Sequence, residues 1–465
     1  MKLLPFLMLL PGLTLAQTPT PSPGIGLTRA AQPARLAPVA PAPGLSLQQA
    51  VAEALAHNFD IRLARLDEQV AANNVTRGNA GQLPGVSGNL NRQFFNNNIT
   101  QLVGDNAPRV INGGTSNLFN TNATLNWTVF DGLAMFISYD RLRAVRSQQQ
   151  QLTRATVEET VERVTGAYFE VVRQAGRIRS LEEALAIGQV RIDLTRARAE
   201  VGVSAKVEVL TARVDYNADR SLLLRQQQAL TAAKINLNSL LGRAPRLDFR
   251  PTDSLSVRRD LREETILAGI RANNPRLSQA RLGQDVATYN RRLASAARLP
   301  QLGVFTGYGL NRNINNAFFI NLPTGPVQTT STNTTHGLNY GLSASVPLFS
   351  GGNLRRQEQN ARVAEEQSQV ALAQTSLQLD ADATTAFAQY QNFIQLLDLE
   401  EANARLARQN VQIALERYRL GLLTPLALRE AQRSQLDAAV RLLDIRFDAK
   451  QAETALRRLS GGLVQ

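Results

Sequence analysis

The sequence predicts a mainly helical chain that also carries membrane-type strands and contains the same structural unit twice. Hydrophobic residues make up 43% of the 465 residues and aromatic residues only 5%, a composition typical of long helices. Stretches in which apolar and uncharged polar residues alternate interrupt the helical pattern, and landmark residues recur at a constant spacing. We therefore expect a duplicated order of helix, two strands, long helix and helix.

The N-terminal residues predict export. Lys2 precedes an apolar run from Leu3 to Leu15, and Ala16 provides a small residue at the end of this run, which is the layout of a signal peptide over residues 1–16. Residues 17–44 contain seven prolines and cannot bury a core, so this segment is predicted to be a linker. The alternative for this linker is an arm that spans the periplasm or contacts peptidoglycan.

An internal repeat organises the rest of the chain. Gly202 and Gly421 lie in similar sequences and are separated by 219 residues (421 − 202). The same separation links Phe130 with Phe349, Tyr168 with Phe387, and Gly242 with Gly461. A repeat of this length is too long for a solenoid. We therefore predict two related units, over residues 45–250 and 251–465.

Uncharged alternating segments predict membrane strands. Leu125, Trp127 and Val129 alternate with Asn and Thr, and the same pattern recurs from Leu338 to Val346. Runs of about ten residues suit a tilted strand that faces lipid on one side, and no stretch after residue 16 is apolar for long enough to span as a helix. The alternative is a soluble antiparallel sheet, whose polar face would normally carry Lys, Glu or Arg.

Two strands per unit predict four strands per chain, over about residues 86–95, 120–130, 302–310 and 338–349. Four strands cannot close a barrel, and an open edge in lipid leaves backbone groups unsatisfied at a cost of several kcal/mol each. Several copies must therefore assemble. Two copies give eight strands around an interior filled by side chains, whereas three give twelve strands with room for a pore.

Long helices are predicted after each strand pair. Residues 132–199 contain no proline, and Val157, Val161, Val164, Tyr168 and Val171 recur at the spacing of a coiled-coil seam. Residues 352–419 are equally long and also lack proline. The first long helix should be followed by helices over residues 205–241 and 265–299, which together match its length.

Charge and chemistry exclude several functions. The net charge of +13 arises from arginines that are interleaved with acids, which favours an anionic surface or lipid headgroup over nucleic acid as a partner. His57 and His336 lack the spacing of metal ligands, there is no Cys, and no nucleotide-binding motif is present. We therefore expect a protein that is not an enzyme and that uses no metal or cofactor.

Together, these motifs resemble those of the TolC-like outer membrane factor family from about Leu45 onward. The resemblance rests on the repeat, on the junctions at residues 129–133 and 346–352, and on the turns around Gly202 and Gly421. It implies a homotrimer with a twelve-stranded β-barrel in the outer membrane, continued by a twelve-helix tunnel in the periplasm. It also implies a passive exit channel of a tripartite efflux or type I secretion system. Its partners would be a periplasmic adaptor, outer-membrane lipid and an inner-membrane pump of the RND, ABC or MFS type.

The same resemblance suggests functional residues at the periplasmic tip, where the adaptor would open the channel. The adaptor-docking positions are Gly202, Val203, Ser204, Gly421, Leu422, Leu423 and Thr424. The gate positions are Glu208, Tyr418 and Glu430. Leu423 stands where the family has an arginine, so a more apolar closure is expected. A periplasmic coiled-coil adaptor or an envelope structural protein remains the alternative function.

Overall fold

A computed structural model describes residues 43–102, 109–319 and 327–463, which belong to one unit that begins at Pro43. The signal peptide predicted over residues 1–16 lies outside these ranges, as does nearly all of the linker predicted over residues 17–44. Within the described residues, no helix combines the length and the apolar character needed to cross a membrane.

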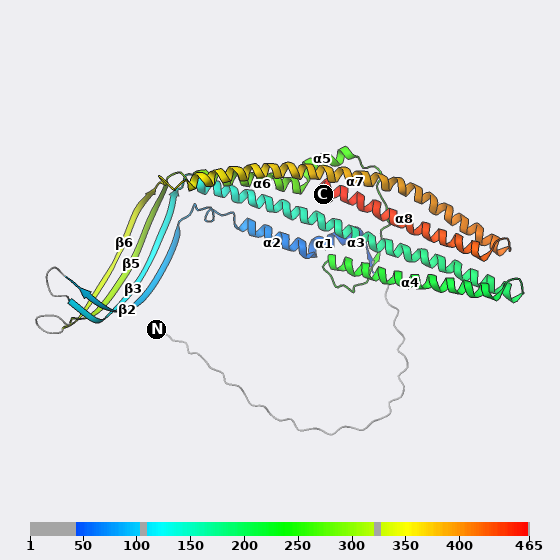
Figure 1. The fold of residues 1–465 in the computed structure, drawn as a ribbon, viewed down its shortest axis with the longest axis horizontal. Coiled ribbons are helices and arrows are strands. Elements are labelled where there is room, and N and C mark those ends of the chain that lie inside the picture. The colour runs from blue at the N-terminus through cyan, green and yellow to red at the C-terminus, as the bar shows by residue number, and fades with distance from the viewer. Residues whose placement is uncertain (1–42, 103–108, 320–326, 464–465) are drawn as a thin grey trace, which may run out of the picture. The chain divides into compact units, whose positions relative to one another are not determined.

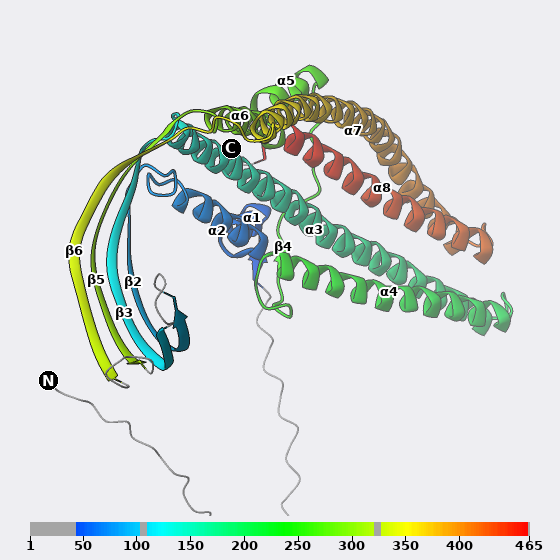
Figure 2. The ribbon, with the colours of Figure 1, turned by 60° about the vertical axis from the view of Figure 1, so that its left-hand side comes forward.

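One antiparallel sheet contains the predicted strands (Figures 1 and 2). It comprises β2 (Gly85–Gln101), β3 (Arg109–Phe130), β5 (Gln301–Phe319) and β6 (Val327–Ser345), in the order β2-β3-β5-β6. All four strands are longer than expected, and β6 ends at Ser345 rather than Phe349. The next residues explain this end, because Pro347 has no backbone N–H to donate to the ladder.

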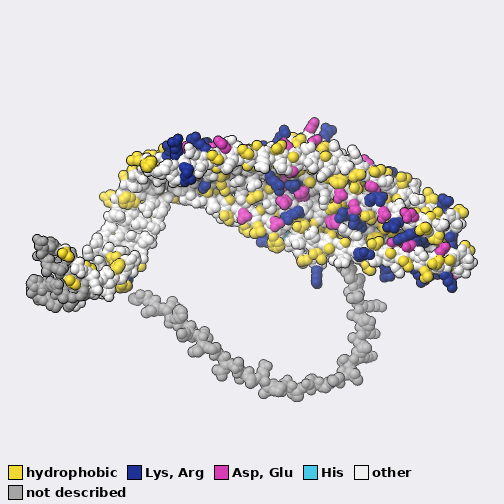
Figure 3. Space-filling model, in the orientation of Figure 1, with side chains coloured by type: hydrophobic (Ala, Val, Ile, Leu, Met, Phe, Trp, Pro, Cys, Tyr) yellow, Lys and Arg dark blue, Asp and Glu magenta, His cyan; other side chains and the backbone are white. Residues whose placement is uncertain are grey.

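The two faces of the sheet differ as the alternation predicts. On the polar face, uncharged side chains pair across strands, with the hydroxyls of Ser87 and Thr124 2.9 Å apart and the amide of Asn89 donating to Asn122 at 3.1 Å. On the other face, apolar side chains such as Leu342 remain exposed. In Figure 3, charged side chains gather over the helices, whereas the described part of the sheet in view is hydrophobic or uncharged.

Two helical hairpins follow the strand pairs. The first consists of α3 (Ala134–Glu200) and α4 (Lys206–Leu240), and the second of α7 (Asn353–Arg419) and α8 (Pro425–Leu459). Their lengths match, with 67 residues in each first helix and 35 in each second helix. The predicted seam is buried at Val161, Val164, Tyr168 and Val171, while Val157 is half-buried.

Each predicted first helix is in fact two helices. These are α1 (Leu47–His57) and α2 (Phe59–Asn73) in the first half, and α5 (Glu263–Asn273) and α6 (Pro275–Ala296) in the second. The backbone is extended at Asn58 and Asn274, and each side chain caps the helix that follows. Pro275 reinforces the second break, since it has no N–H for a continuous helix.

The helices do not stack in chain order. The helices expected over residues 205–241 and 265–299 pack differently: α4 packs on α3, whereas α6 packs between α3 and α7. Within the first half, α1 and α2 pack on α3 in addition to α4. Helices from both halves therefore form one layer (Figure 1).

The landmark glycines form two equivalent joints. The Asn58 amide donates to the carbonyl of Leu240 at 2.8 Å, and the Asn274 amide donates to that of Leu459 at 2.8 Å. Next to these bonds, Gly242 and Gly461 adopt φ angles of 69° and 68°. A Cβ atom on either glycine would lie 2.6 Å from a backbone oxygen, that of His57 or Asn273. The joints therefore require glycine for both conformation and space.

Gly461→Ala is expected to destabilise the fold by at least about 2 kcal/mol, because left-handed backbone costs about 1–2 kcal/mol without glycine and the methyl group overlaps a carbonyl oxygen. Thermal unfolding followed by circular dichroism tests this. The control is Gly202→Ala, where φ is 78° but nothing lies within 4 Å of the added Cβ. Equal melting temperatures for the two variants would contradict the steric argument.

Candidate functional site

The two hairpin turns present apolar side chains to solvent. Gly202 and Gly421 end the long helices with φ angles of 78° and 79°, as expected for left-handed helix caps. Immediately after them, Val203 is 75% exposed and Leu422 is 65% exposed. Thr424 caps α8 by accepting a hydrogen bond from the backbone N–H of Ala427. The turns are thus rigidly capped but have apolar surfaces that are not covered by this chain.

Two of the predicted docking residues point inward instead. Ser204 is half-buried, and its hydroxyl donates to the carbonyl of Thr195 at 3.4 Å. Leu423 packs against a buried cluster that includes Tyr418 and Leu428. The apolar residue at position 423 therefore contributes to packing between the two helices of the second hairpin.

Tyr418 links the two hairpins. Its side chain is fully buried, and its hydroxyl lies 2.7 Å from the hydroxyl of Thr195 on α3. Arg198, also on α3, donates to the carbonyl of Tyr418 at 2.6 Å and places its guanidinium 4.7 Å from the ring centre. The tip of α7 is therefore fastened to α3 by two hydrogen bonds and a cation–π contact.

The structure does not join the other two predicted gate residues to Tyr418. Glu208 is half-buried in the first turn of α4, and Glu430 is exposed on α8. Neither carboxylate makes a side-chain hydrogen bond or an ion pair with any residue that the structure describes. Glu208 instead lies where the positive end of the helix dipole stabilises an acid.

A buried ionic cluster that we did not predict crosses between the hairpins. Arg429 on α8 donates to both oxygens of Asp219 on α4, at 2.6 and 2.9 Å. Asp215, one turn earlier on α4, pairs with Arg191 on α3 and lies 3.8 Å from Arg429. These four residues are named the tip ionic cluster. The side chains of Arg191 and Asp219 are only 3% and 5% exposed.

The tip ionic cluster is balanced in charge, with two arginines and two aspartates. Hydrogen bonding to Asp219 raises the pKa of Arg429 above its ordinary value, so the guanidinium stays charged. Buried pairs of this kind are costly to break because one charge is then left without a partner. Asp215 and Asp219 are one helical turn apart, which was a visible signal, but their partner Arg429 is 210 residues from Asp219.

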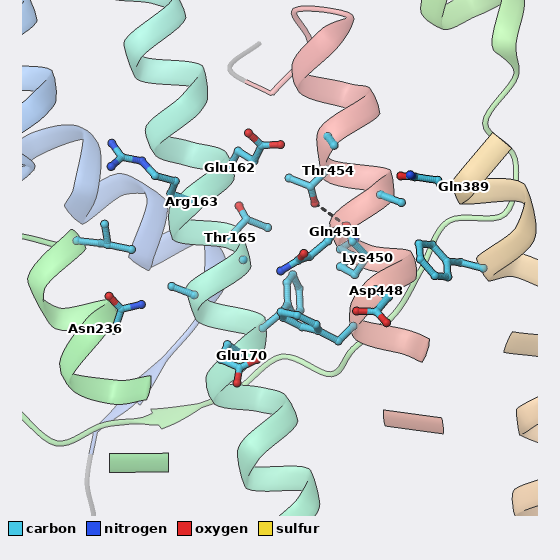
Figure 4. Close-up of a pocket in the computed structure, with 18 residues that line it drawn as sticks. Glu162, Arg163, Thr165, Glu170, Asn236, Gln389, Asp448, Lys450, Gln451 and Thr454 are labelled. Atoms are coloured by element: carbon cyan, nitrogen blue, oxygen red, sulfur yellow. Dashed lines mark hydrogen bonds between the residues drawn. The ribbon is translucent and has the colours of Figure 1, made fainter. Parts of the chain in front are cut away.

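A groove of about 850 Å³ lies between the long helices, well away from the turns (Figure 4). Glu162 and Glu170 line it from α3, and Asp448 and Gln451 from α8. Burial raises the pKa of Asp448 above its ordinary value. No group of three or more His, Cys, Asp or Glu side chains could hold a metal ion anywhere in the part of the chain that the structure describes.

Both lateral edges of the helical layer carry exposed apolar seams. On α7 and its C-cap residue, exposed apolar residues recur every seven positions at Leu399, Leu406, Ile413 and Leu420. On α2, the exposed residues follow the four-three spacing of a coiled coil, at Phe59, Leu63, Leu66 and Val70. In the sheet, β2 and β6 are the two edge strands. Each edge is therefore an unfinished packing surface.

Comparison with known proteins identifies relatives. A family model described as outer membrane efflux protein matches residues 50–243 and 267–462. The outer membrane protein TolC of Vibrio cholerae is 27% identical, over 70% of this chain and 73% of its own length. The probable efflux pump outer membrane protein TtgC of Pseudomonas putida is 25% identical, over 90% of this chain and 83% of its own.

Solved structures share the fold. The outer membrane protein VceC of Vibrio cholerae superposes with a TM-score of 0.70 at 18% identity, covering 90% of this chain and 96% of that one. This likeness agrees with the predicted mainly helical fold that carries a strand region.

Proposed function

The chain belongs to the outer membrane efflux protein family, and from this premise we propose that it is the passive exit channel of a tripartite efflux or type I secretion system. Its place is the outer membrane, with a large helical portion in the periplasm. The observation that carries the proposal is the family match over both halves, combined with strands that expose one apolar face and hairpins that extend away from them.

Three copies close the channel in this proposal. The edge formed by β2 and α2 differs from the edge formed by β6 and α7, and contact between two different edges generates a ring. Three copies supply twelve strands for a barrel and twelve helices for a tunnel. The exposed seams of α2 and α7 support this assembly, because each has the spacing that pairs with another helix.

The proposed channel opens at its hairpin tips. An adaptor docks on the two turns, at the exposed Gly202, Val203, Gly421, Leu422 and Thr424 with Ser204 and Leu423 packed beneath them, and connects the channel to an inner-membrane pump of the RND, ABC or MFS type. The exposed side chains of Val203 and Leu422 support apolar docking. Tyr418 and the tip ionic cluster hold the hairpins together in the closed state, and docking shifts the population towards separated hairpins.

The repeated order of elements is attributed to duplication of a unit, with copies over residues 45–250 and 251–465. Equal helix lengths in the two halves and the equivalent joints at Asn58 and Asn274 support this origin. The repeat places one hairpin below each strand pair, so that three copies present six hairpins around the proposed tunnel.

Extraction and conductance measurements test the proposed function. The purified protein should require detergent, run as a trimer of slightly less than three times 50.8 kDa because the signal peptide is removed, and form ion-conducting pores in a planar bilayer. A periplasmic adaptor or an envelope structural protein would yield no pores. A water-soluble, non-conducting monomer would contradict the proposal.

Glu430→Gln is expected to weaken block of the pore by a trivalent cation, because three exposed carboxylates would ring the entrance. We expect the half-blocking concentration to rise about tenfold, which corresponds to a loss of about 1.4 kcal/mol of attraction. Single-channel recording at increasing cation concentration measures the half-blocking concentration. Glu416→Gln removes the same charge from an exposed position on α7 and serves as the control. Unchanged conductance and block in Glu430→Gln would refute the gate assignment.

A further inference from the structure

Exposed arginines concentrate where the helices meet the sheet. Figure 3 shows dark-blue side chains over the end of α6 and the start of α7, next to the strands. The residues there are Arg292 and Arg298 on or just after α6, and Arg355 and Arg356 in the first turn of α7, all exposed. These four are named the junction arginines.

The nearby carboxylates pair with only one of the four junction arginines, Arg298. Glu358 accepts hydrogen bonds from Arg298 and Arg362, both at 2.9 Å, and these bonds hold its pKa below its ordinary value. Glu365 pairs with Arg291. Across the described ranges, Arg292, Arg355 and Arg356 make no ion pair, and Glu366 is the other acid in this part of α7.

The position of the junction arginines matches the depth of lipid headgroups. Arg298 precedes Leu302, on the apolar face of β5, by four residues. Arg355 lies two residues after the start of α7 at Asn353, which is about 3 Å along the helix axis. The headgroup layer on each side of a bilayer is about 5–7 Å thick. Arginines just beyond the apolar face therefore reach this layer.

The chemistry of the site favours phosphate. A guanidinium binds phosphate oxygens through two parallel hydrogen bonds, which lysine cannot do. The first turn of α7 adds the positive end of a 67-residue helix; Ser350 accepts hydrogen bonds from the first two N–H groups of this helix, those of Asn353 at 3.1 Å and Leu354 at 3.4 Å. The site therefore attracts anions through both the side chains and the helix dipole.

We propose that the junction arginines bind the phosphate groups of anionic phospholipids in the leaflet that faces the helices. This inference rests on the proposed function, which sets the strands in the membrane. It assigns a role to part of the excess positive charge of the chain, which is to anchor the channel at a fixed depth.

A single tryptophan allows a direct test. Trp127 is the only tryptophan of the chain; it is 41% exposed and lies three residues before the end of β3. It pairs with Val304 of β5, so it reports on lipid close to the junction arginines. The full-length protein is reconstituted in two mixtures of phosphatidylglycerol and phosphatidylcholine, one with brominated phosphatidylglycerol and the other with brominated phosphatidylcholine. Quenching of Trp127 fluorescence in the two mixtures gives the preference between the lipids.

The wild type is expected to prefer phosphatidylglycerol over phosphatidylcholine at least about threefold at low salt, since each arginine near an anionic membrane surface adds electrostatic attraction to the lipid. The preference should fall in high salt. Arg355→Gln/Arg356→Gln should bring it close to one, whereas Arg405→Gln/Arg408→Gln, with both changes at exposed positions far along the same helix, should leave it unchanged.

The outcomes separate the two proposals. If both brominated lipids quench Trp127 equally in the wild type, or if the Arg355/Arg356 variant keeps the wild-type preference, the lipid inference is overturned while the channel proposal stands. If neither lipid quenches Trp127, the strands do not lie in lipid, and the membrane-spanning proposal fails together with the inference.

Discussion

Ile413→Glu is expected to abolish assembly and, with it, conductance. The side chain of Ile413 is 58% exposed in the single chain and lies at the centre of the α7 seam, which the proposed trimer buries. An unpaired carboxylate in such an interface costs several kcal/mol, and the trimer contains three such interfaces. Mass measurement in detergent and planar-bilayer recording should therefore show monomers without pores.

The adjacent residue provides the control for this variant. Gln412 is exposed but lies about 100° around the helix from Ile413, away from the seam. Gln412→Glu introduces the same charge and should leave trimers and conductance intact. If Ile413→Glu still formed conducting trimers, or if both variants dissociated equally, the α7 seam would not be the assembly surface.

Asp219→Asn should open the tip. Its carboxylate accepts two hydrogen bonds from Arg429, and removing the charge leaves Arg429 without its main partner. Breaking a buried pair costs about 3–5 kcal/mol, but Arg429 is 25% exposed, so we expect about 1–2 kcal/mol after discounting for solvent screening. A loss of this size from the closed state raises the open fraction about fivefold to thirtyfold, since 1.4 kcal/mol is a factor of ten.

Single-channel recording of open probability tests this prediction. Asp193→Asn makes the same charge change at an exposed position on α3 and should leave the open probability at the wild-type value. The exchange Asp219→Arg/Arg429→Asp should restore closure at least in part, which a general loss of stability would not do. An unchanged open probability in Asp219→Asn would show that the tip ionic cluster does not hold the closed state.

Several elements were predictable because their signals are local. The strand alternation around Trp127 repeats every two residues, and the helical seam through Tyr168 repeats every three to four. The caps at Gly202 and Gly421 each depend on the residues of one turn. Errors arose where a single residue ended a pattern that otherwise continued. The early end of β6 depends on Pro347, and the breaks at Asn58 and Asn274 depend on capping side chains within an otherwise helical pattern.

The candidate site was predictable only in part. The turns follow from their glycine caps, whereas the docking role of Val203 and Leu422 came from the family resemblance and stays a prediction. The hydrogen bond of Tyr418 to Thr195 and the tip ionic cluster were not predicted, because their partners are distant in sequence. Glu208 and Glu430 came from a family resemblance, and their roles remain predictions.

By itself, the sequence determined the two long hairpins, the uncharged strands and the family, because periodicity, turn residues and motifs are properties of short segments. The export signal is predicted from the sequence in the same way. Only the tertiary structure decided which helices are neighbours, with α6 between α3 and α7, and which charges meet across the hairpins. Side-chain packing and ion pairing between residues more than 200 positions apart determine which helices are neighbours, and no local pattern encodes such pairings.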